Sequence, residues 1–227
     1  VSSGFVTEAG IVIPYIPYLK ESEWNALLPV SVCYIWQFSY NDKVYYGRHI
    51  EEFLEVLETL PKDIHFIIWV HNLGYEFQFL NNIFTDGWED VFAREPHHPM
   101  KATPKKYPNV EFRCSYILTR KSLDEWGKEL KFNKLHCLDY LTLRTPNTRL
   151  TPDELKYCER DCQVVYKGIC EYLGRYEHIC KIPLTQTGEV RKVVKAKIIK
   201  DRFWYNRILK LIPKDCAFYS IFRETFR

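Results

Sequence analysis

The sequence predicts an α/β domain in which helices cover the faces of a sheet. Apolar residues make up 46% of the 227 residues, which is enough for a sizeable core without disulfides. Strand patterns come first along the chain, and helical patterns then alternate with them. The continuous apolar run His65–Val70 is typical of a strand buried on both faces, and the helical pattern of Tyr75–Phe84 follows it directly. This strand-to-helix passage places the sheet and its covering helices in one domain.

The first part of the chain predicts an irregular segment, a hairpin and a helix. Residues 1–29 mix Gly, Ser and Pro with short apolar pieces, so we expect an irregular excursion there. Val30–Tyr40 is rich in β-branched and aromatic residues, and Asn41-Asp42 predicts a turn into a second strand, Lys43–Tyr46. Glu51–Leu60 has apolar residues at the spacing of an amphipathic helix.

The second part of the chain predicts one more strand and three more helices. Val110–Leu118 has the composition of a strand, and Ser122–Leu130 that of a helix with a capping box. A threonine, a proline and two acids open the helix Thr151–Tyr172, which is a strong helix start. A last helical stretch covers Glu189–Leu211.

Charge and cysteine usage narrow the class of protein. The net charge is only +3, but nine basic residues and one acid lie between Arg191 and Lys214. Such a stretch, interleaved with aromatic residues, suits a phosphate backbone, and a solvated helix face is the alternative. The eight cysteines are scattered, with no Cys-x-x-Cys pair, so we expect free thiols. No apolar run approaches the roughly 20 residues of a membrane span, and we expect a soluble, cytoplasmic protein without a membrane partner.

Two segments carry candidate chemistry. His71–Phe79 lies where the buried strand becomes a helix, and ligands commonly bind at strand ends in α/β sheets. Tyr157 and Asp161 are four residues apart in a predicted helix and therefore share one face. Carboxylate and phenol oxygens in this arrangement suit Mg²⁺ or Mn²⁺. The alternatives are core packing for Tyr157 and an ion pair with Arg160 or a lysine for Asp161.

The two segments resemble the second and third exonuclease motifs of family B DNA polymerases, Asn-x-x-Tyr/Phe-Asp and Tyr-x-x-x-Asp. The likeness is greatest to the protein-primed branch found in phages. Cys114–Leu118, Ser122-Leu123 and Leu138–Tyr140 follow in the family's order. Ile182–Arg191 resembles the segment that joins the exonuclease to the polymerase. The resemblance covers roughly residues 30–227.

This resemblance implies a ribonuclease H-like (DnaQ-like) fold, a mixed sheet with flanking helices, followed by a C-terminal helical segment. It implies a 3′→5′ proofreading exonuclease that hydrolyses the terminal phosphodiester of single-stranded DNA by in-line attack of water. Two cations, Mg²⁺ or Mn²⁺, about 4 Å apart would stabilise the attacking and leaving oxygens. In this division residues 30–180 form the exonuclease-like domain, and residues 181–227 form a basic helical segment leading toward a polymerase domain. Residues 1–29 would follow a missing first strand.

The resemblance also assigns roles to individual residues. Asp161 and Glu76 take metal-ligand positions, although most members have Asp where this chain has Glu76. Tyr157 would orient the attacking water, and Lys134 would assist at the phosphate unless it is an ordinary surface lysine. The residues assigned to the single-stranded 3′ end are His71, Asn72, Tyr75, Phe79, Ser122, Leu123 and Tyr140. Aromatic side chains can stack on bases without reading sequence, and core packing is the alternative for Tyr75 and Phe79.

One motif of the family is not found. The Asp-x-Glu of its first strand has no counterpart before Val30, where the only acids are Glu8, Glu21 and Glu23. The two-metal site is therefore incomplete in this chain as the sequence stands, and we expect the chain to begin after that motif. Tyr219–Arg227 resembles the approach to the polymerase region, without its palm. The expected partners are single-stranded DNA, the remainder of a polymerase and a terminal priming protein.

Two other functions fit the same residues. The first is a non-catalytic module of the same fold that holds single-stranded DNA or the priming protein. The second is a nuclease of another ribonuclease H-like family that acts on RNA. Metal-dependent hydrolysis separates the exonuclease from the binding module, and a comparison of DNA with RNA separates the two nucleases. If the protein is encoded by a phage, it works in the host cytoplasm.

Overall fold

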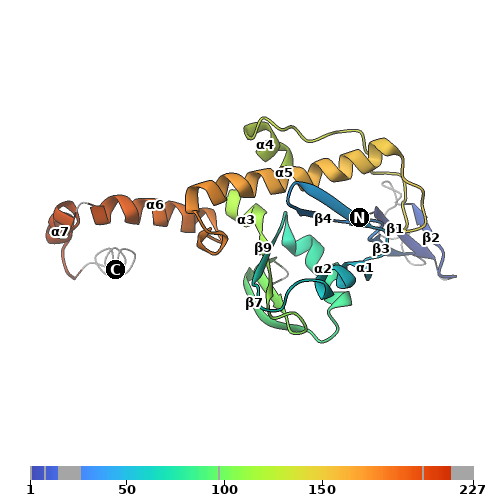
Figure 1. Ribbon diagram of the computed structural model, residues 1–227, viewed down its shortest axis with the longest axis horizontal. Helices are drawn as coiled ribbons and strands as arrows, with labels where there is room; N and C mark the ends of the chain where they lie inside the picture. Colours follow the sequence, from blue (N-terminus) through green and yellow to red (C-terminus); the bar gives the residue numbers. More distant parts are fainter. Residues whose placement is uncertain (1, 8, 15–26, 97, 201, 216–227) are drawn as a thin grey trace.

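The computed structural model describes residues 2–7, 9–14, 27–96, 98–200 and 202–215. Over these residues the chain forms three β-sheets with helices packed around them, which confirms the predicted mixed α/β class. A long helix, α5 (Pro152–Tyr176), crosses the strands, and the chain then continues into helices that extend away from the sheets (Figure 1). None of the helices described is long and apolar enough to cross a membrane.

The N-terminal sheet corrects the prediction of an irregular excursion over residues 1–29. Strand β1 (Ser2–Thr7) pairs antiparallel with β2 (Val12–Pro14) on one side and with β3 (Leu27–Val32) on the other. Prolines and a glycine interrupt the alternation of side chains, and β1 pairs with a strand some twenty residues away, so no local pattern reveals the sheet. Phe5 is fully buried, so the sheet has an apolar anchor. The three early acids, Glu8, Glu21 and Glu23, lie outside the described residues.

The predicted hairpin is confirmed as β4 (Trp36–Tyr40) and β5 (Lys43–Gly47). Asn41 and Asp42 connect them with φ of 49° and 62°, the left-handed conformation that a two-residue hairpin turn requires. The predicted strand Val30–Tyr40 is divided in the structure between β3 and β4. Two different sheets therefore share a segment that the sequence pattern treats as one strand.

The largest sheet has the order β6-β9-β8-β7. Strand β6 (Phe66–Val70) is parallel to β9 (Val110–Cys114), as expected for strands that both lead into helices. Strands β8 (His98–Pro104) and β7 (Trp88–Glu95) extend the sheet antiparallel. The sequence pattern does not predict the β7–β8 hairpin, because β7 is exposed along nearly its whole length and shows no alternation of apolar and polar residues.

The helices before α5 follow the strand ends. Helices α1 (Glu52–Glu58), α2 (Leu73–Ile83) and α4 (Leu123–Glu129) are confirmed, the last with its predicted capping box. The predicted strand Val110–Leu118 is too long, because the chain turns into a short helix, α3 (Ser115–Thr119), at its end. The Ser115 hydroxyl bonds the carbonyl of Val70, and this side-chain contact accompanies the change from strand to helix.

The C-terminal helices are longer and more divided than predicted. Helix α5 has 25 residues and begins at Thr151 with a complete capping box. A short 3₁₀ turn (Ile179–Lys181) leads to α6 (Gln186–Lys200) and α7 (Arg202–Leu211), where one helix was expected. The two helices project from the body of the molecule (Figure 1). The basic stretch contains aromatic residues at positions 203–205, and their side chains are outside the part of the chain that the structure describes.

Two apolar clusters hold the helices to the large sheet. The first joins α1 and α2 to β9, and the Phe53 ring contacts those of Trp36 and Phe112 at 5.7 and 6.4 Å between centroids. The second lies between α3, α4 and α5. There Trp126 packs so tightly on Gly168 that a Cβ at this glycine would lie 2.0 Å from the ring. Helix α5 can approach α4 this closely only because residue 168 has no side chain.

Candidate functional site

Four of the predicted site residues meet on one side of α5. The Nζ atom of Lys134 lies 3.2 Å from Oδ2 of Asp161, and 5.0 Å from the centre of the Tyr157 ring. The hydroxyls of Tyr157 and Tyr140 are 2.5 Å apart, with the rings edge to face. Tyr157 is buried, whereas Tyr140 is 68% exposed. We call Lys134, Tyr140, Tyr157 and Asp161 the α5 cluster.

The environment of the α5 cluster shifts the pKa of two of its groups, the Asp161 carboxyl and the Tyr157 phenol. Burial raises the pKa of Asp161, and the neighbouring Lys134 charge opposes this shift. The Oδ1 atom of Asp161 is buried without a hydrogen-bond partner. Burial and the bond to Tyr140 raise the pKa of Tyr157, so its phenol stays neutral and can donate a hydrogen bond. The cluster thus combines a cation, an incompletely paired carboxylate and a neutral phenol.

The lysine alternative for Asp161 is realised, and the arginine alternative is not. Arg160 places its guanidinium 4.1 Å from the centre of the Phe132 ring and donates to the carbonyl of Asn133. Lys134 is instead the cation beside Asp161, although both groups are partly exposed. An ion pair of this kind is compatible with a structural role and with a role at a phosphate, so the predicted functions of the two residues stay predictions.

Glu76, the other predicted metal ligand, lies in the first turn of α2. Its Oε2 atom is buried without a partner, and burial raises the pKa of this carboxyl to about 7. No hydrogen bond or ion pair joins Glu76 to the α5 cluster within the described part of the chain. Ionisation of this buried carboxyl therefore costs free energy.

The donor chemistry of these carboxylates suits a hard divalent cation only in part. Glu76 and Asp161 each present a buried, unpartnered oxygen, the ligand type that Mg²⁺ and Mn²⁺ prefer. Across the described residues, however, no group of three or more His, Cys, Asp or Glu side chains is placed to hold a metal ion. Glu76 and Asp161 therefore have oxygens of the kind that such a cation binds, and metal binding by the two residues stays a prediction.

The strand-end segment begins with a half-buried histidine that packs against aromatic rings. Nδ1 of His71 lies 3.1 Å from Oγ of Ser115, and its ring stacks on Trp126 at 6.0 Å. The Tyr116 ring meets it edge-on. Burial, helped by the Lys134 charge, lowers the pKa of His71 to about 4. At neutral pH His71 is uncharged, so it offers a nucleic acid no positive charge.

The next predicted contacts, on α2, differ in their availability. Asn72 precedes the helix in the left-handed conformation, with φ of 62°. The rings of Tyr75 and Phe79 meet edge to face at 5.9 Å. Tyr75 is 41% exposed and can accept a stacked base, whereas Phe79 is half-buried. Base stacking remains a prediction for both residues.

Ser122 and Leu123 have structural partners. The Ser122 hydroxyl caps α4 by accepting from the Glu125 backbone N–H and donating to its carboxylate. Leu123 packs against the cluster between α3, α4 and α5. Ser115 and Tyr116, which the sequence analysis did not assign, lie beside His71 instead. Their position directly after a strand is the signal that could have identified them.

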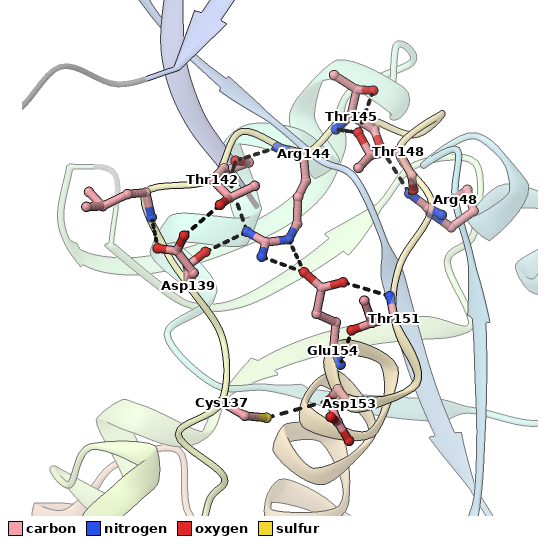
Figure 2. A network of polar contacts seen from close by, with 12 residues as sticks. Arg48, Cys137, Asp139, Thr142, Arg144, Thr145, Thr148, Thr151, Asp153 and Glu154 are labelled. Atoms are coloured by element: carbon pink, nitrogen blue, oxygen red, sulfur yellow. Dashed lines mark hydrogen bonds and ion pairs between the residues drawn. The ribbon is translucent and has the colours of Figure 1, made fainter.

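A buried arginine holds the loop that carries Tyr140 (Figure 2). Arg144 is only 4% exposed and donates to the backbone carbonyls of Asp139 and Thr142 at 2.6 and 2.9 Å. Its Nε also donates to Glu154 at 2.7 Å, the same carboxylate that caps α5 through the N–H of Thr151. The loop and the start of α5 are thereby tied together, which fixes Tyr140 next to Tyr157. No sequence motif predicts this role of Arg144.

Comparisons with known proteins find no relative by sequence and several by structure. No family model matches the chain, and no curated protein matches it. The structure of Phi29 DNA polymerase complexed with single-stranded DNA superposes with a TM-score of 0.56 at 14% identity, covering 88% of this chain and 35% of that one. Its ternary complex with primer-template DNA and incoming nucleotide gives 0.55 at 16% identity, covering 71% and 30%. The orthorhombic crystal form gives 0.55 at 15%, covering 70% and 30%.

These similarities concern the fold. The chain spans about a third of the length of the polymerase chains that it resembles. At this level of identity the comparison shows that the chain shares the architecture of a part of Phi29 DNA polymerase. The ribonuclease H-like details and the division at residues 30 and 181 stay predictions.

Proposed function

We propose that this chain is the 3′→5′ exonuclease portion of a protein-primed DNA polymerase, acting on the 3′ end of single-stranded DNA. The observation that carries the proposal is the α5 cluster. Lys134, Tyr157 and Asp161 are brought together from a loop and a helix, and the carboxylate keeps one buried oxygen without a partner. Perturbed titratable groups gathered in this way are typical of catalytic sites. The structural similarity to part of a DNA polymerase supports the same class of enzyme.

Each member of the α5 cluster has a role in this proposal. The neutral Tyr157 phenol donates its one proton to Tyr140, and its oxygen accepts a hydrogen bond from the attacking water and so orients it. The Lys134 ammonium lies where it can balance the charge of a phosphate oxygen. Tyr75, with its exposed ring, stacks on a base near the 3′ end.

Asp161 and Glu76 are the residues that would hold Mg²⁺ or Mn²⁺. Such a cation, when bound, supplies charge stabilisation for the attacking and leaving oxygens of the phosphodiester. A complete two-metal site needs more carboxylates than these two, and in this proposal the early acids Glu8, Glu21 or Glu23 stand in for the missing ones. The remainder of the polymerase and a priming protein are the partners that the proposal entails.

One observation favours a second candidate, a module of the same fold that binds single-stranded DNA or the priming protein without cleaving it. The described side chains contain no three-ligand metal cluster. Under this alternative Tyr75, Tyr140 and the basic residues of α6 would hold the strand, and Asp161 would be the structural partner of Lys134.

Cleavage assays separate the candidates. A 5′-labelled single-stranded DNA is incubated in Mn²⁺ with the wild-type chain, with Asp161→Asn and with Asp153→Asn, a matched control at an exposed position of α5. The exonuclease proposal expects shortening from the 3′ end by the wild type and the control and none by Asp161→Asn. Binding without shortening by all three proteins would favour the binding module. A preference for an RNA of the same sequence would contradict the DNA polymerase assignment.

A further inference from the structure

A cavity of about 250 Å³ lies outside the α5 cluster, where the parallel strands β6 and β9 end. Its lining comes from four parts of the chain: the start of α2, the tip of the β7–β8 hairpin, the end of β9 and helix α3 with its C-cap. The lining residues that matter for its chemistry are Asn72, Gly74, Arg94, Glu95, His98, Tyr116 and Arg120. The volume is below that of a site for a drug-sized molecule and suits a small polar group.

Two arginines give this cavity its charge. Arg94 comes from β7 and Arg120 follows α3, so distant segments bring the two guanidinium groups to one place. Both residues are exposed, and neither guanidinium has a hydrogen bond or ion pair with a described residue. Glu95 also lines the cavity and offsets one of the two positive charges. The cavity therefore keeps a net positive charge and two guanidinium groups whose N–H donors have no partner among the described residues. Guanidinium groups bind phosphate oxygens through paired N–H donors of this kind.

The other lining groups add donors and no second negative charge. The cavity reaches Asn72 and Gly74, where α2 begins, and the first N–H groups of a helix lack partners within the helix. The helix dipole places partial positive charge at the same end. The Tyr116 hydroxyl and the Asn72 amide can donate as well. An anion entering the cavity would meet donors from at least three elements.

We infer that this cavity binds a phosphate group of a single-stranded nucleic acid, at a second point on the strand besides the α5 cluster. Arg94 and Arg120 hold the phosphate, and the exposed Tyr75 on α2 is available to a neighbouring base. The inference deepens the proposed function and rests on it for the identity of the strand. The cavity's positive charge stands whether or not the chain cleaves DNA.

The test measures binding without cleavage. Fluorescence anisotropy follows a labelled oligo-dT in EDTA, at several salt concentrations, with the wild-type chain and with Arg94→Gln/Arg120→Gln. Arg149→Gln is the matched control, since Arg149 is an exposed arginine that does not line the cavity. Because each phosphate contact contributes about 0.7 to the slope of log K against log salt, the double variant should lose about 0.7 of this slope and bind about fivefold more weakly at 0.1 M salt. Arg94→Lys/Arg120→Lys should keep most of the slope, and circular dichroism checks that every variant is folded.

The outcomes distinguish this inference from the proposed function. An unchanged slope and affinity in the double variant, or equal losses in the Arg149→Gln control, would overturn it. So would a wild-type chain that does not bind the oligonucleotide. If thymidine monophosphate binds in an arginine-dependent way and the oligonucleotide does not, the cavity serves free nucleotides and the inference about a strand is wrong. Arginine-dependent binding by a chain that shows no cleavage in Mn²⁺ would support the cavity and refute the exonuclease.

Discussion

Acidification should destabilise this protein through His71, whose packing in the fold allows only the neutral imidazole. Burial lowers the pKa of His71 to about 4, whereas an unfolded chain has a histidine pKa of about 6.5. Below pH 6.5 the histidine of the unfolded chain therefore binds a proton, whereas His71 in the folded protein stays unprotonated until the pH approaches 4. The stability that neutral His71 contributes is complete above pH 6.5 and is lost as the pH falls toward 4.

The size of the effect follows from the two pKa values. The full difference of 2.5 corresponds to about 3.4 kcal/mol, because one pKa unit is worth 1.36 kcal/mol. Between pH 7 and pH 5 only part of it is lost, about 2 kcal/mol. Lys134 is the charged group whose field reaches His71, and its positive charge acts in the same direction as burial.

The assay compares urea unfolding at pH 7 and pH 5, followed by tryptophan fluorescence, for the wild type and for His71→Phe. Phenylalanine retains an aromatic ring against Trp126 but cannot titrate, and Ser115 keeps its bond to the Val70 carbonyl. The variant should lose about 2 kcal/mol less than the wild type between the two pH values. His65→Phe, at an exposed position, is the control and should behave as the wild type does. Equal losses in wild type and His71→Phe would refute the reasoning.

Three further changes test other parts of the structure. Glu76→Gln should raise the melting temperature at pH 8 in EDTA and change it little at pH 5, because the pKa of this buried carboxyl is raised to about 7; calorimetry that shows a decrease at pH 8 would contradict this. Arg144→Met should cost about 3–5 kcal/mol by leaving Glu154 without its buried partner, and a loss below 1 kcal/mol in urea titration would show that the network is dispensable. Gly168→Ala should cost about 1–3 kcal/mol, since its Cβ would overlap the Trp126 ring, and wild-type stability of this variant would mean that α5 and α4 can separate.

Local chemistry made much of the fold predictable. The Asn41-Asp42 turn, the capping box that opens α4 and the threonine and proline that open α5 depend on a few neighbouring residues, and all three are confirmed. The β1–β3 pairing and the β7–β8 hairpin were missed for the opposite reason. Their partners are far apart or their side chains are exposed, so neither periodicity nor composition marks them.

The same distinction applies to the candidate site. Tyr157 and Asp161 were placed together because a helix brings residues four apart onto one face. Only the resemblance to a family motif points to Lys134, and this lysine lies beside Asp161 in the structure. The sequence does not pair Arg94 with Arg120, since only the pairing of β7 with β8, and of β8 with β9, brings them to one cavity.

The buried polar network around Arg144 is better explained by the position that it gives the loop carrying Tyr140 than by a gain in folding stability. Replacing a buried ion pair with apolar residues of similar volume is often neutral or stabilising, so the pair alone gives the fold little advantage. What the network does is geometric. Arg144 donates hydrogen bonds to the backbone carbonyls of Asp139 and Thr142 in the loop. It also donates to Glu154, which lies in the first turn of α5, three residues before Tyr157. A purely apolar contact would cover the same surface without fixing the loop's carbonyls. The directional bonds therefore set where the exposed Tyr140 ring meets Tyr157, which is the contact that the proposed chemistry requires.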